Sequence, residues 1–218
     1  MPTIKNTLVI NEIFFSIQGE STQAGQPCVF VRLMACDLRC SWCDTTYAFT
    51  EGAEISIDAI LEKVKAYHCK LVEITGGEPL LQENVHILMQ RLCNDGFDVM
   101  IETGGHHDIG KIDPRVKRIM DIKCPGSKME KRNRWENIPL LTTNDEVKFV
   151  IADEADYAWA KNVLEQYRLP QRCTILMSPV FGSMNNRTLA EWILRDQLKV
   201  IFQLQLHKYI WDPTTRGV

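Results

Sequence analysis

The chain has 218 residues, of which 45% are hydrophobic and 24% are charged, as is ordinary for a globular domain. The formal net charge of −3 gives no electrostatic reason to expect a nucleic-acid or membrane surface. The N-terminal segment lacks the apolar core of a signal peptide, and no apolar run approaches the ~20 residues that span a bilayer. We therefore expect a single cytoplasmic domain over residues 1–218, with no membrane and no direct nucleic-acid partner.

Strand-like and helical patterns alternate along the chain. The strand-like runs are short, apolar and β-branched, and the helical segments repeat apolar residues at helical spacing. In chain order we predict strands at residues 7–10 and 29–34, a helix at 56–68 with Ser56 as its N-cap, a strand at 70–75, a helix from Pro79 to just before Gly96, strands at 97–102, 116–122 and 146–151, a helix at 155–167, a strand at 174–178, a helix at 187–195 and a strand at 199–204.

Repeated strand–helix units imply a parallel sheet with right-handed crossovers. The polar segments nearly all follow the C-terminal ends of predicted strands, at residues 36–43, 76–79, 103–105, 123–127, 179–182 and 205–209. Function gathered on the loops of one rim is the arrangement of a barrel. The predicted fold class is therefore α/β, a partial (β/α) TIM-like barrel of about six parallel core strands.

Three of the eight cysteines fall within eight residues, at Cys36, Cys40 and Cys43. Three thiolates on one tight loop can hold three irons of a [4Fe–4S] cubane and leave the fourth iron open to a small molecule. A structural zinc site usually has four ligands and a second cysteine or histidine pair. A dithiol redox pair would not need the third thiol. Three scattered cysteines inside apolar segments are predicted to be core residues: Cys28, Cys93 and Cys173.

Residues 76–79 read Gly-Gly-Glu-Pro directly after a predicted strand. Two glycines let the backbone approach a ligand closely, and the Glu78 carboxylate is a candidate to bind an ammonium group. The Cys-x3-Cys-x2-Cys spacing, with Trp42 before the last cysteine and this loop after the next strand, resembles the signature of the radical S-adenosylmethionine (SAM) superfamily. The resemblance implies a [4Fe–4S] cluster on the three cysteines, SAM at its open iron, and a 5′-deoxyadenosyl radical that abstracts hydrogen from the substrate.

Further segments resemble the 7-carboxy-7-deazaguanine synthase family across essentially the whole chain. They are residues 11–21, 30–33, 43–45, 121–127, 147–150 and 205–211. The resemblance implies a lyase that converts 6-carboxy-5,6,7,8-tetrahydropterin to 7-carboxy-7-deazaguanine with loss of ammonia, in queuosine (7-deazapurine) biosynthesis. It also implies that SAM is regenerated, that Mg²⁺ is required, that the enzyme is a homodimer, and that a reductase or flavodoxin-like protein donates the electron.

The same resemblance assigns roles to individual residues. Substrate contacts are implied for Ile17, Gln18, Gly19, Arg32, Thr75 and Val218. SAM contacts are implied for Trp42, Cys43, Asp44, Gly77, Glu78, Lys123, Cys124 and Pro125. Thr45 is implied as the magnesium ligand. Glu102 is a candidate ribose contact and residues 178–181 are a candidate adenine contact, whereas His106 and His107 match no role and are expected in a solvated loop.

After the last predicted strand, residues 205–218 leave from the rim that carries the cysteines. A radical intermediate needs shielding from solvent. We therefore expect this C-terminal tail to cover the active site, with the Val218 carboxylate near the substrate; the alternative is a frayed terminus. Two other functions share some motifs: an activating enzyme that generates a glycyl radical on a protein partner, and a non-catalytic iron–sulfur electron carrier.

Overall fold

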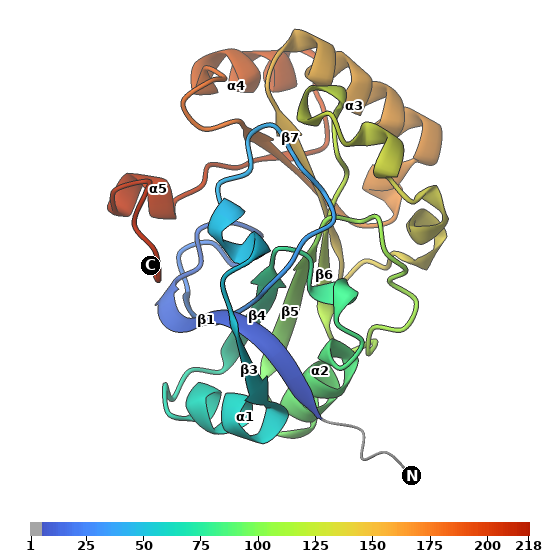
Figure 1. Ribbon diagram of the computed structural model, residues 1–218. Helices are drawn as coiled ribbons and strands as arrows, with labels where there is room; N and C mark the ends of the chain where they lie inside the picture. The colour runs from blue at the N-terminus through green and yellow to red at the C-terminus, as the bar shows by residue number, and fades with distance from the viewer. Residues whose placement is uncertain (1–5) are drawn as a thin grey trace.

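A curved sheet of nine strands forms the frame of the molecule. The computed structural model describes residues 6–218, and its strand order is β3-β1-β2-β4-β5-β6-β7-β8-β9 (Figure 1). The strands are β1 (Thr7–Ile17), β2 (Pro27–Leu33), β3 (Ala53–Ser56), β4 (Leu71–Gly76), β5 (Asp98–Thr103), β6 (Lys117–Asp121), β7 (Glu146–Ile151), β8 (Thr174–Pro179) and β9 (Ile201–Phe202). Neighbours from β2 to β9 run parallel, whereas β1 is antiparallel to β2 and β3. Because β3 and β9 are the two ends of this order, the barrel is open, which confirms the predicted fold class.

Helices α1 (Ile57–Lys65), α2 (Val85–Asn94), α3 (Glu154–Tyr167) and α4 (Asn186–Arg195) cover the outside of the sheet. The short α5 (His207–Ile210) lies apart from them, beside β1 (Figure 1). Ser56 caps α1 as predicted, since its side chain accepts a hydrogen bond from the Ala59 amide. Asp153 and Asn185 cap α3 and α4 in the same way. Within residues 6–218, no helix has the length and apolarity that crossing a membrane requires.

Several elements differ from the sequence prediction. The last strand, β9, has two residues where a strand over residues 199–204 was predicted, and the short helix α5 was not predicted. Strand β1 has 11 residues instead of four, and the edge strand β3 had no recognisable pattern. The second helix begins at Val85, not at Pro79, because residues 79–81 form a separate turn that the Glu78 side chain caps at the Leu80 amide. These changes lengthen the wall on the β1 side and place a rigid turn at the end of β4.

Along each strand, alternate side chains face opposite sides of the sheet and form two separate cores, one outer and one inner. Residues such as Val31, Ile74 and Ile101 face outward and pack with the helices in the large core. A smaller apolar cluster lies on the opposite, inner face and is made of Phe14, Cys28, Phe30, Met100 and Ile119. Cys28 and Cys173 are buried as predicted, and Cys93 is half-buried against the outer core.

Candidate active site

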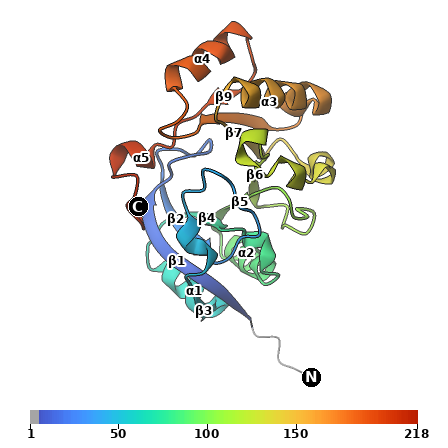
Figure 2. The same cartoon turned by 45° about the horizontal axis from the view of Figure 1, so that its top comes forward.

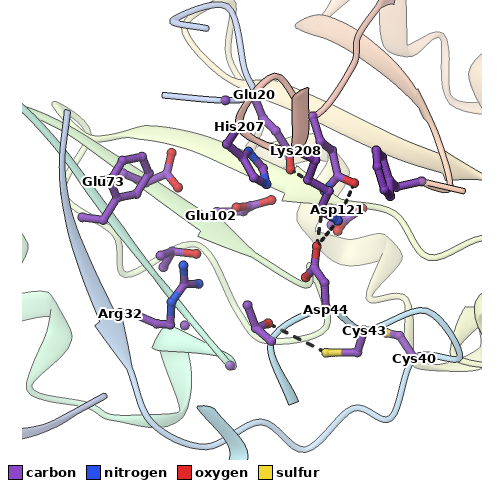
Figure 3. Close-up of a pocket in the computed structure, with 18 of the residues that line it drawn as sticks. Glu20, Arg32, Cys40, Cys43, Asp44, Glu73, Glu102, Asp121, His207 and Lys208 are labelled. Atoms are coloured by element: carbon purple, nitrogen blue, oxygen red, sulfur yellow. Dashed lines mark hydrogen bonds and ion pairs between the residues drawn. The ribbon is translucent and has the colours of Figure 1, made fainter. Parts of the chain in front are cut away.

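A cavity of about 750 Å³ lies on the inner face of the barrel, at the C-terminal ends of the parallel strands. Phe14 and Phe30 of the inner apolar cluster line part of it, and the remaining wall combines charged and polar side chains with apolar ones. Side chains reach it from the first strand, the parallel strands and the C-terminal segment (Figure 3). The cavity is therefore large enough for two small molecules side by side and has an apolar region at one end.

All three clustered cysteines line this cavity. Cys36, Cys40 and Cys43 are partly exposed, and none forms a disulfide. Across the loop, a Cβ on Gly77 would lie 2.0 Å from the Ala35 carbonyl oxygen and 3.0 Å from the Cys36 Cβ. Only glycine allows the Gly-Gly-Glu-Pro loop to lie this close to the cysteine loop. Three unpaired thiols facing one cavity fit a [4Fe–4S] cluster with three protein ligands.

The Glu78 carboxylate is buried, and its hydrogen bonds are made with donors of the protein itself. It accepts hydrogen bonds from the Leu80 amide (3.0 Å), the Thr103 hydroxyl (2.8 Å) and the Gly104 amide (2.8 Å). Although Glu78 lines the cavity, these bonds fasten its loop to the end of β5. The carboxylate therefore positions the loop, which is a different role from the direct ammonium contact considered from the sequence.

The interpretation of His106 as a residue of a solvated loop is wrong. Its side chain is only 2% exposed, and its Nε2 lies 2.6 Å from Asp37 Oδ1 in the cysteine loop. Its Nδ1 lies 3.7 Å from Glu78 Oε2. His107 is more exposed and contacts the same Asp37 oxygen at 3.3 Å. His106 thus connects the cysteine loop to the loop that follows β4.

Charged side chains on the inner strands form a second group that the sequence reasoning largely missed. Lys148 of β7 is buried and pairs with Glu20 at 2.7 Å and with Glu102 of β5. Burial would lower the pKa of Lys148, but the two carboxylates raise it well above its usual range. Burial also raises the pKa of Glu102. A charged residue within an otherwise apolar strand pattern is the signal that could have revealed Lys148 and the buried Glu73 of β4.

The residues after β6 divide into two sets. Lys123 lines the cavity, and its ammonium group lies 2.7 Å from Asp121 Oδ2. Cys124 is 1% exposed within the outer core, and neither it nor Pro125 lines the cavity. The structure therefore brings Lys123 to the cysteines but does not bring the Cys124 thiol there.

The residues implied to bind substrate or magnesium lie together on the cavity wall. Arg32 of β2 is the register partner of Thr75 of β4, and its Nε donates to Glu12 Oε1 at 2.8 Å. Thr45 places its hydroxyl 3.8 Å from the Cys43 sulfur. The full set at the cavity is Ile17, Gln18, Gly19, Arg32, Thr45, Thr75 and Val218, together with Trp42, Cys43, Asp44, Gly77, Glu78 and Lys123 from the implied SAM contacts.

The C-terminal segment forms one side of the cavity. Figures 1 and 2 show α5 and the chain that follows it beside β1, and the Leu206 amide donates to the Gly19 carbonyl at 2.9 Å. A Cβ on Gly19 would lie 2.0 Å from His207 Nδ1, so this contact requires glycine. Lys208 pairs with Asp44 at 2.6 Å. Residues 213–218 line the cavity, whereas Tyr209 and Ile210 are about half exposed despite their apolar surface.

Deleting Val218 and the two residues before it tests whether the C-terminal segment contacts the substrate. Removing residues 216–218 should raise the KM for the substrate that the cavity holds by about tenfold, the equivalent of one lost contact of ~1.4 kcal/mol. Iron content and SAM affinity should not change. Ile210→Ala is the matched control, because Ile210 lies in the same segment, is about half exposed and does not line the cavity. A truncated enzyme with an unaltered KM would show that these residues only pack against the protein.

Comparisons with known proteins identify relatives over nearly the whole chain. The model of the Radical SAM superfamily matches residues 32–192. The chain is 49% identical over 214 residues to a 7-carboxy-7-deazaguanine synthase of Chlorobaculum tepidum, with 97% of each chain covered. It is 44% identical to the protein of the same name from Koribacter versatilis, covering 96% of this chain and 99% of that one. The crystal structure of QueE from Escherichia coli has the same fold, with a TM-score of 0.75 at 22% identity, over 90% of this chain and 94% of that chain.

Proposed function

Since this chain belongs to the radical SAM superfamily and, within it, to the 7-carboxy-7-deazaguanine synthase family, we propose that it converts 6-carboxy-5,6,7,8-tetrahydropterin to 7-carboxy-7-deazaguanine with loss of ammonia. The observation that carries the proposal is the 49% identity over 97% of the chain, joined to a cavity that three unpaired cysteines line. The product belongs to queuosine biosynthesis. Identity over the full length of a small-molecule enzyme disfavours the glycyl-radical activating enzyme and the electron carrier.

The [4Fe–4S] cluster and SAM, when bound, supply the radical chemistry. The chain's own residues bind and orient the cluster, SAM and the substrate. Cys36, Cys40 and Cys43 would hold the cluster, and the loop fixed by Glu78 would support SAM beside it. Because only the Nε of Arg32 is engaged within the described residues, the other guanidinium nitrogens are free to bind the substrate carboxylate. The C-terminal segment would exclude water from the reacting centre.

The test is anaerobic turnover. Reconstituted protein, a strong reductant, SAM and 6-carboxytetrahydropterin should give the ultraviolet spectrum of the deazapurine, with SAM regenerated. Omitting SAM or the reductant should abolish the signal. Turnover of SAM to 5′-deoxyadenosine without any deazapurine would support the activating enzyme instead.

The proposal includes a magnesium ion held by Thr45 and by substrate oxygens. The hydroxyl of Thr45 faces the same cavity as the cysteines, and hydroxyl and carboxylate oxygens suit this ion. Thr45→Ala should raise the Mg²⁺ concentration for half-maximal activity about tenfold, as expected for the loss of one ligand contact. Thr46→Ala is the matched control, because Thr46 is exposed and does not line the cavity. Equal magnesium activation curves for the wild type and Thr45→Ala would exclude the role.

The remaining partners rest on the family resemblance: a homodimer and a reductase or flavodoxin-like electron donor. A cytoplasmic location is supported by the cysteines, because all eight are free thiols. Oxidising compartments favour disulfides, and reducing ones do not.

A further inference from the structure

Glu73 is a buried carboxyl group on the inner face of the barrel that the proposed chemistry leaves without a role. Its neighbours on β4, Val72 and Ile74, face outward into the core with the helices. Glu73 itself aligns with Phe30 of β2 and Met100 of β5, two members of the inner apolar cluster. It lies two residues before Thr75 and therefore one layer deeper in the barrel than the level of Arg32.

The hydrogen bonds of Glu73 leave half of its carboxyl group available. The residue is 4% exposed and lines the cavity. The Gln18 amide donates to Oε2, and the Gln18 carbonyl oxygen accepts from the Glu20 amide at 3.0 Å, so Gln18 is fixed at both ends. Within residues 6–218, Oε1 has no hydrogen-bond partner, and this oxygen keeps some exposed surface. It is therefore an acceptor directed at the cavity.

The chemistry of the substrate sets its orientation. Hydrogen is abstracted at carbon 6, which also bears the carboxylate, so this end must face the cysteines and the Arg32 guanidinium. The aminopyrimidine ring lies at the other end of the bicyclic pterin and must extend away from the cysteines. In Figure 3, Glu73 lies on the side of the cavity away from Cys40 and Cys43.

We propose that Glu73 is a specificity-determining residue that accepts hydrogen bonds from the 2-amino group and the adjacent ring N–H of the substrate pterin. This inference rests on the proposed function. The edge of an aminopyrimidine presents two parallel N–H donors, which a carboxylate matches in the same way as it matches a guanidinium. Phe14 and Phe30, which stack at 4.9 Å, supply apolar surface beside the ring.

The electrostatic surroundings of Glu73 explain why such a ligand would be favoured. Burial, together with the nearby carboxylate of Glu102, raises the pKa of Glu73 to about 8. The groups that face it are Gln18, Glu20, Cys28, Glu102 and Lys148. Three carboxyl groups thus share one ammonium group, and a ligand with N–H donors stabilises the ionised form of the third. Binding at neutral pH would therefore release a proton from Glu73, and substrate affinity should rise with pH up to about 8.

The experiment compares wild-type and Glu73→Gln holoenzymes, using 6-carboxytetrahydropterin and its analogue without the 2-amino group. Glu73→Gln should raise the KM for the pterin about 10–100-fold with little change in kcat, as expected for loss of charged hydrogen bonds in binding. The wild type should prefer the pterin to the analogue by a similar factor, and the variant should lose most of this preference. The KM of the wild type should fall between pH 6 and 8, whereas that of the variant should not.

Stability against urea separates a binding effect from a folding defect. A carboxyl group whose pKa is raised on folding contributes stability at low pH that is lost between pH 4.5 and about 8, because the folded state keeps the proton there. The glutamine side chain of the Glu73→Gln variant cannot ionise, so the stability of the variant should not fall over this pH range for that reason. If the wild type makes product but does not discriminate against the analogue, the inference is wrong and the proposed function stands. If the wild type makes no deazapurine, both the inference and the proposed function are wrong.

Discussion

Replacing Cys40 with alanine should abolish product formation. The other two cysteines of the loop would leave a second iron without a protein ligand, and cubane clusters of this kind need all three thiolates. No neighbouring thiol can substitute, because Cys124 is 1% exposed in the outer core and its burial raises the thiol pKa well above the usual value. The measurements are iron and sulfide content after anaerobic reconstitution, the visible absorption of the cluster, and deazapurine formation.

Cys93→Ala is the matched control for this variant. Cys93 lies near the C-terminal end of α2, is half-buried against the outer core and does not line the cavity. It should keep full cluster content and turnover. Normal iron content and full activity in Cys40→Ala would refute the assignment of the cysteine loop.

Lys148→Met should cost about 2–4 kcal/mol of unfolding free energy, which is a large share of the stability of a domain. The methionine fills the space of the side chain but removes the partner of both Glu20 and Glu102. The carboxylates of Glu20 and Glu102 would then face each other without a cation. Because both reach the cavity, the loss of unfolding free energy should be smaller than for carboxylates that are completely buried. Urea denaturation monitored by tryptophan fluorescence measures the change.

The dependence on pH identifies the cause of this loss. Without the ammonium group, the pKa of Glu102 should rise further above 4.5, so the variant should be weakest near pH 8 and recover as the carboxyl groups protonate toward pH 5. Lys111→Met is the control, since its exposed pair with Glu83 contributes little. An equal loss at pH 5 and pH 8 would show that packing, and not charge, is responsible.

The repeating parts of the fold were predictable from the sequence, and the parts that depend on contacts between distant segments were not. The parallel strands have continuous apolar runs, and Ser56 provides a local capping signal for α1. The helix predicted to start at Pro79 was displaced because the Glu78 side chain takes the Leu80 amide and fastens to Thr103, a residue from the next strand. Pro79 fits the first turn of either structure, so only that tertiary contact decides between them.

The candidate site divides in the same way. Motifs with fixed spacing placed the cysteines and Gly77 at the cavity, because such spacing reflects the geometry of a ligand. His106, Glu73 and Lys148 belong to no motif, and their importance arises from partners on other strands. Cys124 shows the converse, since it lies within a segment that resembles the family while its side chain points into the core.

The contacts between the segment after β1 and the segment after β9 have a consequence for assembly of the enzyme. Ser21 and Gln203, which exchange two hydrogen bonds across the barrel, are separated by 182 residues. Contacts between segments this far apart in the chain are slow to form, so we expect them late in folding. The cysteine loop depends on such contacts as well, because Asp37 pairs with His106 and Arg132 and the Ser41 amide donates to the Ser127 carbonyl. We therefore expect the three thiols to reach their final arrangement, and to accept iron, only when most of the barrel is in place.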